Sequence, residues 1–221
     1  MNVLDAMRGR KSTRAYLDKP VARATIEAIL DAARWAPSGV NCQPWQVAVV
    51  TGTIKARIGD ELLAARQARQ PENPDYAYYP KDWQEPYKSR RKATGLALYQ
   101  ALKIGKDDAF ARIKAWNNNY RFFGAPVGLL FFVDRALAQG AWVDMGMFIQ
   151  NVMLAARGHG LETCPQASLA EYPDIVRGIL TIPATRALVC GMALGYADAS
   201  APVNRYRIER EPMNAFTSWY E

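Results

Sequence analysis

Apolar residues recur along this chain in two patterns. Spacings of three and four residues predict amphipathic helices, and the segments expected to be helical are 3–8, 21–35, 53–68, 87–102, 106–116, 139–157 and 170–179. Short continuous apolar runs predict buried strands, and these runs are 45–50, 126–133 and 187–195. Helical and strand segments alternate, so the pattern by itself allows a parallel α/β sheet.

One helical segment, 139–157, is apolar on several sides rather than along a single stripe. A helix of that kind is usually buried deeply, either in a protein core or at the centre of a dimer. Met145, Met147 and Met153 are interpreted as packing residues and not as ligands, because a flexible thioether fills irregular gaps well.

The segment 69–86 follows neither pattern. Its prolines at positions 71, 74, 80 and 86 prevent a regular element, and its aromatic residues are unusual in a disordered linker. Such a segment is typical of a functional lid or an interface loop. An irregular surface excursion is the alternative. The aromatic residues are Tyr76, Tyr78, Tyr79 and Trp83.

Composition indicates a globular protein, because 50% of the 221 residues are apolar and 22% are charged. This length suits one domain with a substantial core and also allows two small ones. The formal net charge of +7 favours nucleic acid, an anionic membrane or small anionic ligands. Nucleic-acid motifs and stretches long enough to span a membrane are absent, and the densest basic group, 88–92, is interpreted as a solvated helix face. We therefore expect small anionic ligands, no nucleic acid and no membrane partner.

The cysteines and the single histidine argue against several kinds of site. Cys42, Cys164 and Cys190 lie far apart without CxxC spacing, so neither a disulfide framework nor a zinc site is expected. The single histidine, His159, is interpreted as a cation at the end of a helix, which leaves almost no room for histidine-based catalysis or metal binding. The start of the chain lacks a cleavable signal pattern, and the expected location is a reducing cytoplasm.

Two short polar segments flank the helix expected at 21–35. The first, Arg10-Lys11-Ser12-Thr13-Arg14, combines three cations with two hydroxyls, which suits charge-assisted hydrogen bonds to a phosphate. The second, 36–45, contains two prolines, a glycine and small polar residues, which predicts a sharp turn before the strand. Each segment alone is weak evidence, because arginine clusters are often solvated and such loops are often plain turns.

Three further motifs accompany these segments. They are Asn118-x-x-Arg121 before an apolar strand, Gly160-Leu161-x-x-Cys164-Pro165-Gln166-Ala167, and Asn204-Arg205 with Arg210-x-Pro212. Together, in this order, the five motifs resemble the nitroreductase family of flavin mononucleotide (FMN) enzymes over nearly the whole chain. The resemblance implies a single FMN-binding domain, residues 1–221, with an aromatic lid or insertion at about 69–86.

The same resemblance implies an α+β fold in three layers, in which helices flank a small, mainly antiparallel sheet. It also implies an intertwined homodimer with active sites at the subunit interface, in which the C-terminal tail adds a strand to the partner's sheet. The apolar Phe216, Trp219 and Tyr220 on an otherwise polar tail agree with that exchange.

For the FMN phosphate, the resemblance implies binding by Arg10 and Arg210, with Lys11 and Ser12 adding donors. Ile208 is a departure, because some relatives have a second basic ligand at this position. A neighbouring arginine could substitute, or fewer cations hold the phosphate. The candidates for this substitution are Arg205 and Arg207.

For the flavin ring, the resemblance implies Arg14 and Arg121 beside the pyrimidine edge and Asn118 on the ring edge or ribityl chain. The ring face opposite the substrate would be lined by Pro165, Gln166 and Ala167. The FMN of the partner subunit would be reached by Pro37, Ser38, Gly39 and Asn41. The substrate side is assigned to Tyr76, Tyr78, Tyr79, Trp83 and Phe123.

The activity implied is two-electron reduction of a nitroaromatic or quinone-like compound by NADPH or NADH, in a ping-pong sequence at one slot. FMN would carry the chemistry, so no catalytic side chain and no metal is required. The glycines at 191–195 fall within an expected strand and do not form a dinucleotide-binding loop. The alternatives are sister chemistry on the same fold, such as reductive dehalogenation or flavin and quinone reduction, and a non-catalytic flavin-binding protein.

Overall fold

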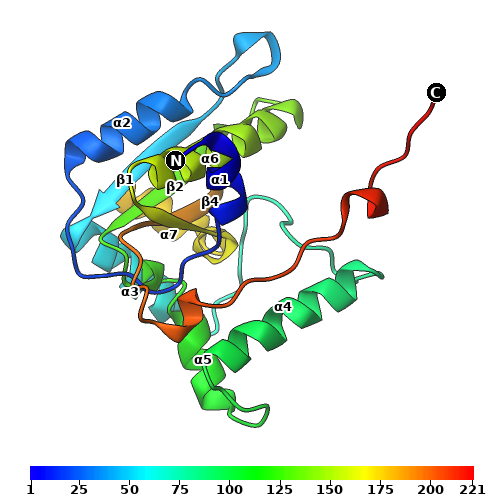
Figure 1. Cartoon of the computed structure of the whole chain (residues 1–221). Helices are drawn as coiled ribbons and strands as arrows, with labels where there is room; N and C mark the ends of the chain where they lie inside the picture. Colours follow the sequence, from blue (N-terminus) through cyan, green and yellow to red (C-terminus); the bar gives the residue numbers. More distant parts are fainter.

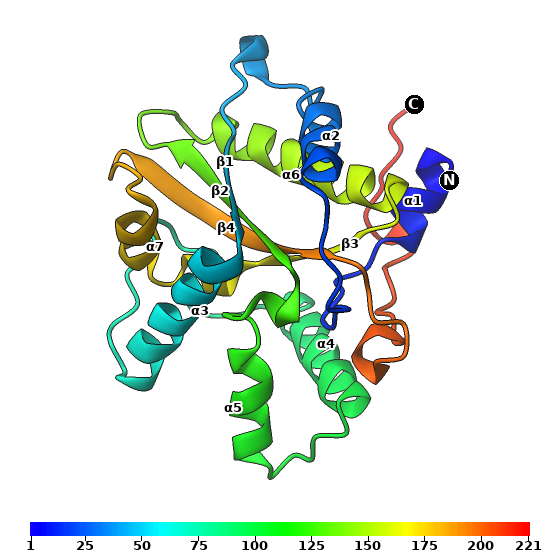
Figure 2. The same ribbon diagram turned by 90° about the vertical axis from the view of Figure 1, so that its left-hand side faces the viewer.

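The computed structural model describes residues 1–221 as a four-stranded sheet with helices packed on both faces (Figures 1 and 2). The strands follow the order β1-β2-β4-β3, and every neighbouring pair is antiparallel. The α+β fold with a small antiparallel sheet is therefore confirmed, and the parallel arrangement is not formed. The strands are β1 (Gln46–Thr51), β2 (Val127–Asp134), β3 (Glu162–Gln166) and β4 (Arg186–Gly195).

The seven expected helices are all present, and their ends lie within three residues of the expected ones. The helix expected from position 106 begins later because the side chain of Asp108 accepts a hydrogen bond from the N–H of Ala111 (2.8 Å) and caps it there. No helix combines the length and the apolar character needed to cross a membrane. The helices are α1 (Val3–Gly9), α2 (Arg23–Ala33), α3 (Gly52–Gln67), α4 (Tyr87–Ala101), α5 (Ala109–Asn117), α6 (Gly140–Gly158) and α7 (Pro173–Leu180).

The central strand β2 is buried on both faces, which explains its continuous apolar run. Leu129 and Phe131 point to the face covered by α2 and α6, whereas Leu130 and Phe132 point to the face covered by α3 and α7. Because side chains alternate between the faces of a strand, a strand with two covered faces loses the apolar–polar alternation.

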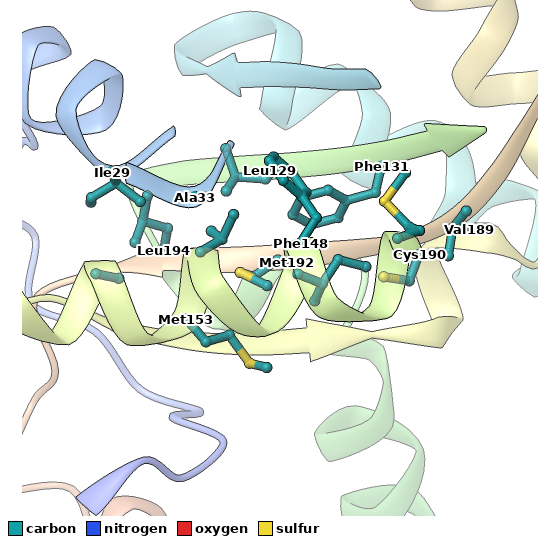
Figure 3. Close-up of a cluster of buried hydrophobic side chains, with 14 of the residues drawn as sticks. Ile29, Ala33, Leu129, Phe131, Phe148, Met153, Val189, Cys190, Met192 and Leu194 are labelled. Atoms are coloured by element: carbon teal, nitrogen blue, oxygen red, sulfur yellow. The ribbon is translucent and has the colours of Figure 1, made fainter. Parts of the chain in front are cut away.

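The helix α6 supplies many of the buried side chains between α2, α6 and the sheet, as predicted from its apolar character. Met145 is 1% exposed, and Phe148 stacks on Trp45 with ring centroids 4.9 Å apart. Ile29 and Ala33 of α2 belong to the same cluster of buried side chains (Figure 3). One face of this helix is therefore buried within one chain, whereas Val143 on another side is 66% exposed.

Strand β3 was not expected, since only a binding segment was predicted there. It has five residues, includes Pro165 and lacks an apolar run. Proline is tolerated because β3 is the edge strand of the sheet, where the ladder needs fewer N–H donors. Sequence periodicity is a poor guide to so short an edge strand.

The aromatic insertion, residues 69–86, contains no helix or strand, as predicted. Its first half is tied to the sheet by Asp75, whose side chain is 3% exposed. The carboxylate accepts hydrogen bonds from the Arg177 guanidinium (2.6 and 3.2 Å), from the N–H of Leu188 (2.7 Å) and from Arg135. Burial alone would raise the pKa of Asp75, but these hydrogen bonds outweigh it and hold the pKa below its ordinary value.

Removing the charge of Asp75 should destabilise the fold. Asp75→Asn leaves Arg177, whose side chain is 8% exposed, without its buried partner, and we expect the free energy of unfolding to fall by about 3–5 kcal/mol. Urea denaturation at pH 7 measures this change. The matched control is Asp31→Asn. Asp31 is an exposed partner of Arg34, so this substitution should lower the free energy of unfolding by less than about 1 kcal/mol.

The pH dependence of unfolding gives an independent readout of the same pair. A carboxylate with a lowered folded-state pKa stabilises the fold above its ordinary pKa near 4, and this contribution is lost as the pH falls through the folded-state value. Wild-type stability should therefore decline in that acidic range more steeply than that of Asp75→Asn. Equal stability of the two proteins at pH 7, with parallel acid profiles, would contradict the assignment.

Candidate functional site

Two adjoining cavities lie beside the edge strand β3, with volumes of about 450 and 760 Å³. Arg14 and Thr94 line both cavities, so the two are neighbours. We call the smaller one the basic cavity and the larger one the aromatic cavity, after their lining residues. Thr94 of α4 lines both cavities, and Figure 2 shows α4 and α5 projecting from one side of the sheet.

The basic cavity is lined by six cations and no carboxylate. Burial and the neighbouring Arg210 guanidinium lower the pKa of Arg10, which means that the two positive charges lie close enough to repel each other. Arginine remains charged under these conditions, so the cavity presents a strong positive potential. An oxyanion such as a phosphate relieves that repulsion through charge-assisted hydrogen bonds. The six cations are Arg8, Arg10, Lys11, Arg14, Arg207 and Arg210.

The segment 10–14 is held in place by a buried amide. Asn204, at the end of the short turn Pro202–Asn204, accepts a hydrogen bond from the N–H of Arg14 (2.8 Å) and donates to the carbonyls of Ala15 and Asp198 (both 2.8 Å). The N–H of Thr13 donates to the carbonyl of Thr163 in β3 (3.0 Å). The cations therefore project from a backbone that is fixed to the sheet.

The aromatic cavity lies between the insertion, one face of α4 and the end of β3. Tyr76 is the fixed point of the insertion, because its hydroxyl donates to the carbonyl of Val189 (2.7 Å) and its ring packs on Trp142 (4.4 Å between centroids). Cys164 also lines this cavity, and burial raises the pKa of its thiol. The thiol is therefore uncharged and suited to packing, as the sequence suggested.

Two buried polar atoms in the aromatic cavity have no partner within the protein. Gln166 is 3% exposed, and its Nε2 donates to the carbonyl of Asn119 (2.6 Å) while Oε1 accepts nothing. The hydroxyl of Ser168 is likewise unpaired. Buried polar groups are normally hydrogen-bonded, so both atoms are suited to a polar ligand.

These features fit FMN, the cofactor that the resemblance implies. A phosphate matches the basic cavity, and an aromatic ring system with hydrogen-bonding edges matches the aromatic cavity with its unpaired Gln166 and Ser168 atoms. Because the cavities adjoin at Arg14, one ligand can occupy both.

Most residues expected at the site are brought together. The basic cavity contains the expected phosphate residues, and the aromatic cavity contains most of the expected ring and substrate residues. In the basic cavity these are Arg10, Lys11, Ser12, Arg14 and Arg210. In the aromatic cavity they are Tyr76, Tyr78, Tyr79, Asn118, Phe123, Pro165, Gln166 and Ala167.

Two of the residues expected beside the flavin ring or the substrate lie outside both cavities. Arg121 is exposed and its guanidinium lies 3.6 Å from the carboxylate of Asp60, so its place beside the ring stays a prediction. Trp83 does not line the aromatic cavity, but its ring contacts two residues that do, Tyr79 (5.6 Å between centroids) and Arg91 (5.2 Å to the guanidinium).

The turn expected to reach a second subunit also lies outside the cavities. The N–H of Gly39 donates to Asp144 of α6 (3.2 Å), and the hydroxyl of Ser38 accepts from the N–H of Gln43 (3.0 Å). This turn, between α2 and β1, is at the end of the molecule opposite α4 and α5 (Figures 1 and 2). Within one chain, therefore, Pro37, Ser38, Gly39 and Asn41 do not meet the other site residues.

The cavity wall made by α4 was not expected from the sequence. Thr94 and Leu98 of α4 and Leu102, which directly follows the helix, recur at four-residue spacing and line the aromatic cavity, although α4 has no buried residue. An apolar stripe on a helix that is otherwise polar was the available signal. Arg8 and Tyr206 in the basic cavity were also missed, and nothing but their nearness to expected residues could have indicated them.

Comparison with known proteins agrees with this geometry. The model of the nitroreductase family matches residues 7–196. A 4-nitrobenzoate reductase from Pseudomonas putida is 40% identical, covering 94% of this chain and 91% of the relative. A nitrobenzene nitroreductase from Ectopseudomonas oleovorans is 38% identical, covering 97% and 95%. The crystal structure of the FMN- and NADPH-dependent nitroreductase NfnB from Sphigopyxis sp. strain HMH superposes with a TM-score of 0.97 at 40% identity, covering all of both chains.

Proposed function

This chain belongs to the nitroreductase family, and we propose that it is an FMN-dependent oxidoreductase that uses NADPH or NADH to reduce nitroaromatic compounds. The observation that carries the proposal is the adjoining pair of cavities, one basic and one aromatic, joined at Arg14 and Thr94. The relatives leave the charge of the substrate open, because 4-nitrobenzoate carries a carboxylate and nitrobenzene is neutral.

In this proposal, the phosphate of FMN is held by Arg10, Lys11 and Arg210 in the basic cavity. Of the two arginines that could replace the missing basic ligand at Ile208, Arg207 lines this cavity and Arg205 does not. Arg207 is also oriented by a hydrogen bond that it donates to the carbonyl of Arg8. We therefore assign the additional phosphate contact to Arg207.

The residues of the aromatic cavity position the flavin ring and the substrate. FMN supplies two-electron hydride transfer when bound. Arg14, oriented by a hydrogen bond to the hydroxyl of Tyr206 (3.1 Å), provides a fixed positive charge that stabilises negative charge developing nearby. Gln166 and Ser168 offer their unpaired polar atoms to the ring. The tyrosines of the insertion cover the cavity and provide flat apolar surfaces for an aromatic substrate.

We further propose that the chain is one FMN-binding domain, residues 1–221, and acts as an intertwined homodimer. The C-terminal tail extends away from the sheet (Figure 1), and its Phe216, Trp219 and Tyr220 are largely exposed in the single chain. Large exposed apolar side chains favour a protein partner. The turn at 37–41, remote from the cavities of its own chain, would then complete the site of the partner. A cytoplasmic location stays a prediction.

The function can be tested by absorbance spectroscopy of the purified protein. A yellow protein whose flavin absorbance bleaches on anaerobic addition of NADPH and recovers on addition of 4-nitrobenzoate or nitrobenzene would support both half-reactions. A protein that neither contains nor takes up FMN would refute the function. Flavin that binds but is not reduced by NADPH or NADH would favour the non-catalytic alternative.

The phosphate assignment predicts that Arg10→Ala weakens FMN binding. Loss of a charge-assisted hydrogen bond costs about 1.5–3 kcal/mol, so the dissociation constant should rise by roughly 10- to 150-fold in a titration of the apoprotein. Arg57→Ala is the control, because Arg57 is an exposed partner of Glu61 outside both cavities. An Arg10→Ala protein with wild-type FMN affinity would remove Arg10 from the phosphate site.

The tail exchange predicts that deletion of residues 212–221 weakens the dimer. The deletion keeps Arg210 and the ion pair between Arg90 and Glu211, so the basic cavity is retained. Sedimentation analysis over a concentration series should show dissociation to monomers at concentrations where the full chain is dimeric. A truncated protein with the same dimer dissociation constant would rule out a stabilising exchange.

A further inference from the structure

Two cations of the aromatic cavity have no role in the proposed cofactor site. Arg91 of α4 lies three residues before Thr94, so it belongs to the same face of the helix as the cavity wall. Lys81 of the insertion lines the same cavity. Neither side chain forms an ion pair with any carboxylate of the chain.

The position of Arg91 is set by a series of aromatic contacts. Its guanidinium lies 5.2 Å from the centroid of the Trp83 ring. Trp83 packs on Tyr79 (5.6 Å between centroids), Tyr79 on Tyr78 (4.7 Å), and Tyr78 on the anchored Tyr76 (6.0 Å). A guanidinium held over an aromatic face has already lost part of its side-chain conformational freedom. Less entropy is then lost when a ligand binds, and this favours binding.

Lys81 lies near this arrangement because it precedes Trp83 by only two residues. Two extended residues span about 7 Å at most, so the backbones of Lys81 and Trp83 are close. The insertion thus brings Lys81 into the same cavity that Arg91 faces from α4.

The other charged groups of the cavity are largely engaged. Arg14 donates to Tyr206 (3.1 Å). Glu171 accepts a hydrogen bond from the hydroxyl of Tyr120 and lies 3.8 Å from the Arg66 guanidinium. Glu72 is the one remaining carboxylate that lines the cavity. Three cations and two carboxylates thus line the cavity, and Lys81 and Arg91 are the two cations that form neither an ion pair nor a side-chain hydrogen bond.

We propose that Lys81 and Arg91 form an anion subsite of the aromatic cavity, which binds the carboxylate of an anionic aromatic substrate. Planar guanidinium groups match carboxylates well, and an ammonium group adds a second positive charge. The proposal rests on the proposed function and specifies its substrate class as nitroaromatic acids. A phosphate of the nicotinamide nucleotide has the same oxyanion chemistry and is the alternative source.

Binding of unreactive ligands to the FMN-loaded protein tests the subsite without any redox step. Benzoate and benzamide have nearly the same shape but differ in charge, and calorimetry gives both dissociation constants. Arg91→Gln and Lys81→Gln should each weaken benzoate binding by about 3- to 10-fold, the range of partly exposed charge pairs, and change benzamide binding less than about twofold.

Two variants serve as matched controls. Lys92→Gln removes a neighbouring cation of α4 that does not line the cavity, and it should change neither constant. Arg91→Lys keeps the positive charge and should restore most of the benzoate affinity. Equal loss of benzoate and benzamide in Arg91→Gln, or no loss of either, would overturn the subsite.

The alternative anion, a phosphate of the nicotinamide nucleotide, is tested by measuring the affinities for NADP⁺ and NAD⁺, which differ by one phosphate. A loss of NADP⁺ affinity that spares NAD⁺ and benzoate would overturn the carboxylate assignment and place the nucleotide phosphate at Lys81 and Arg91. The outcomes are separable from failure of the proposed function. A protein that reduces nitroaromatics but has an unchanged preference for benzoate over benzamide in Arg91→Gln refutes only the subsite.

Discussion

Burial of both faces of the central strands is the constraint that determines where this protein can bind a ligand. β2 and β4 are covered by helices on either side, so neither strand can offer a polar surface to a ligand. The residues of the sheet that can contact a ligand therefore lie on β3, the edge strand, where Pro165 and Gln166 line a cavity. The segment 10–14 is attached to this same edge by the hydrogen bond from Thr13 to Thr163, which brings the cations next to it.

The basic cavity is organised by a neutral residue. Asn204 makes three hydrogen bonds to the backbone around segment 10–14, and an amide can both donate and accept in this role. A carboxylate at the same position would accept but could not donate, and it would offset part of the positive potential of Arg10 and Arg210. The amide keeps the segment rigid while leaving the charge of the cavity available to a phosphate.

The fold could be predicted from the sequence where burial is strong and continuous. The runs of β2 and β4 and the apolar faces of the helices identified their elements, whereas β3 was missed because a five-residue edge strand with a proline has no distinctive period. Arg10, Lys11, Ser12 and Arg14 of the basic cavity were predictable as a group because they are nearly contiguous in sequence. The α4 wall was not, since its residues face a cavity and not a core. The predicted roles of Arg121 and of the turn at 37–41 involve a flavin ring and a second subunit, and neither group belongs to this chain.

The exposed character of α4 has a thermodynamic consequence. Because none of its residues is buried, this helix gains little from the core. Its order depends on its neighbours, which include η4 (Pro202–Asn204) and the ion pair from Arg90 to Glu211. Yet its Thr94 lines both cavities, so an occupant of either cavity adds contacts to the helix. Ordering of α4 and occupancy of the cavities are thus linked, so a ligand that contacts Thr94 is expected to stabilise this helix against local unfolding.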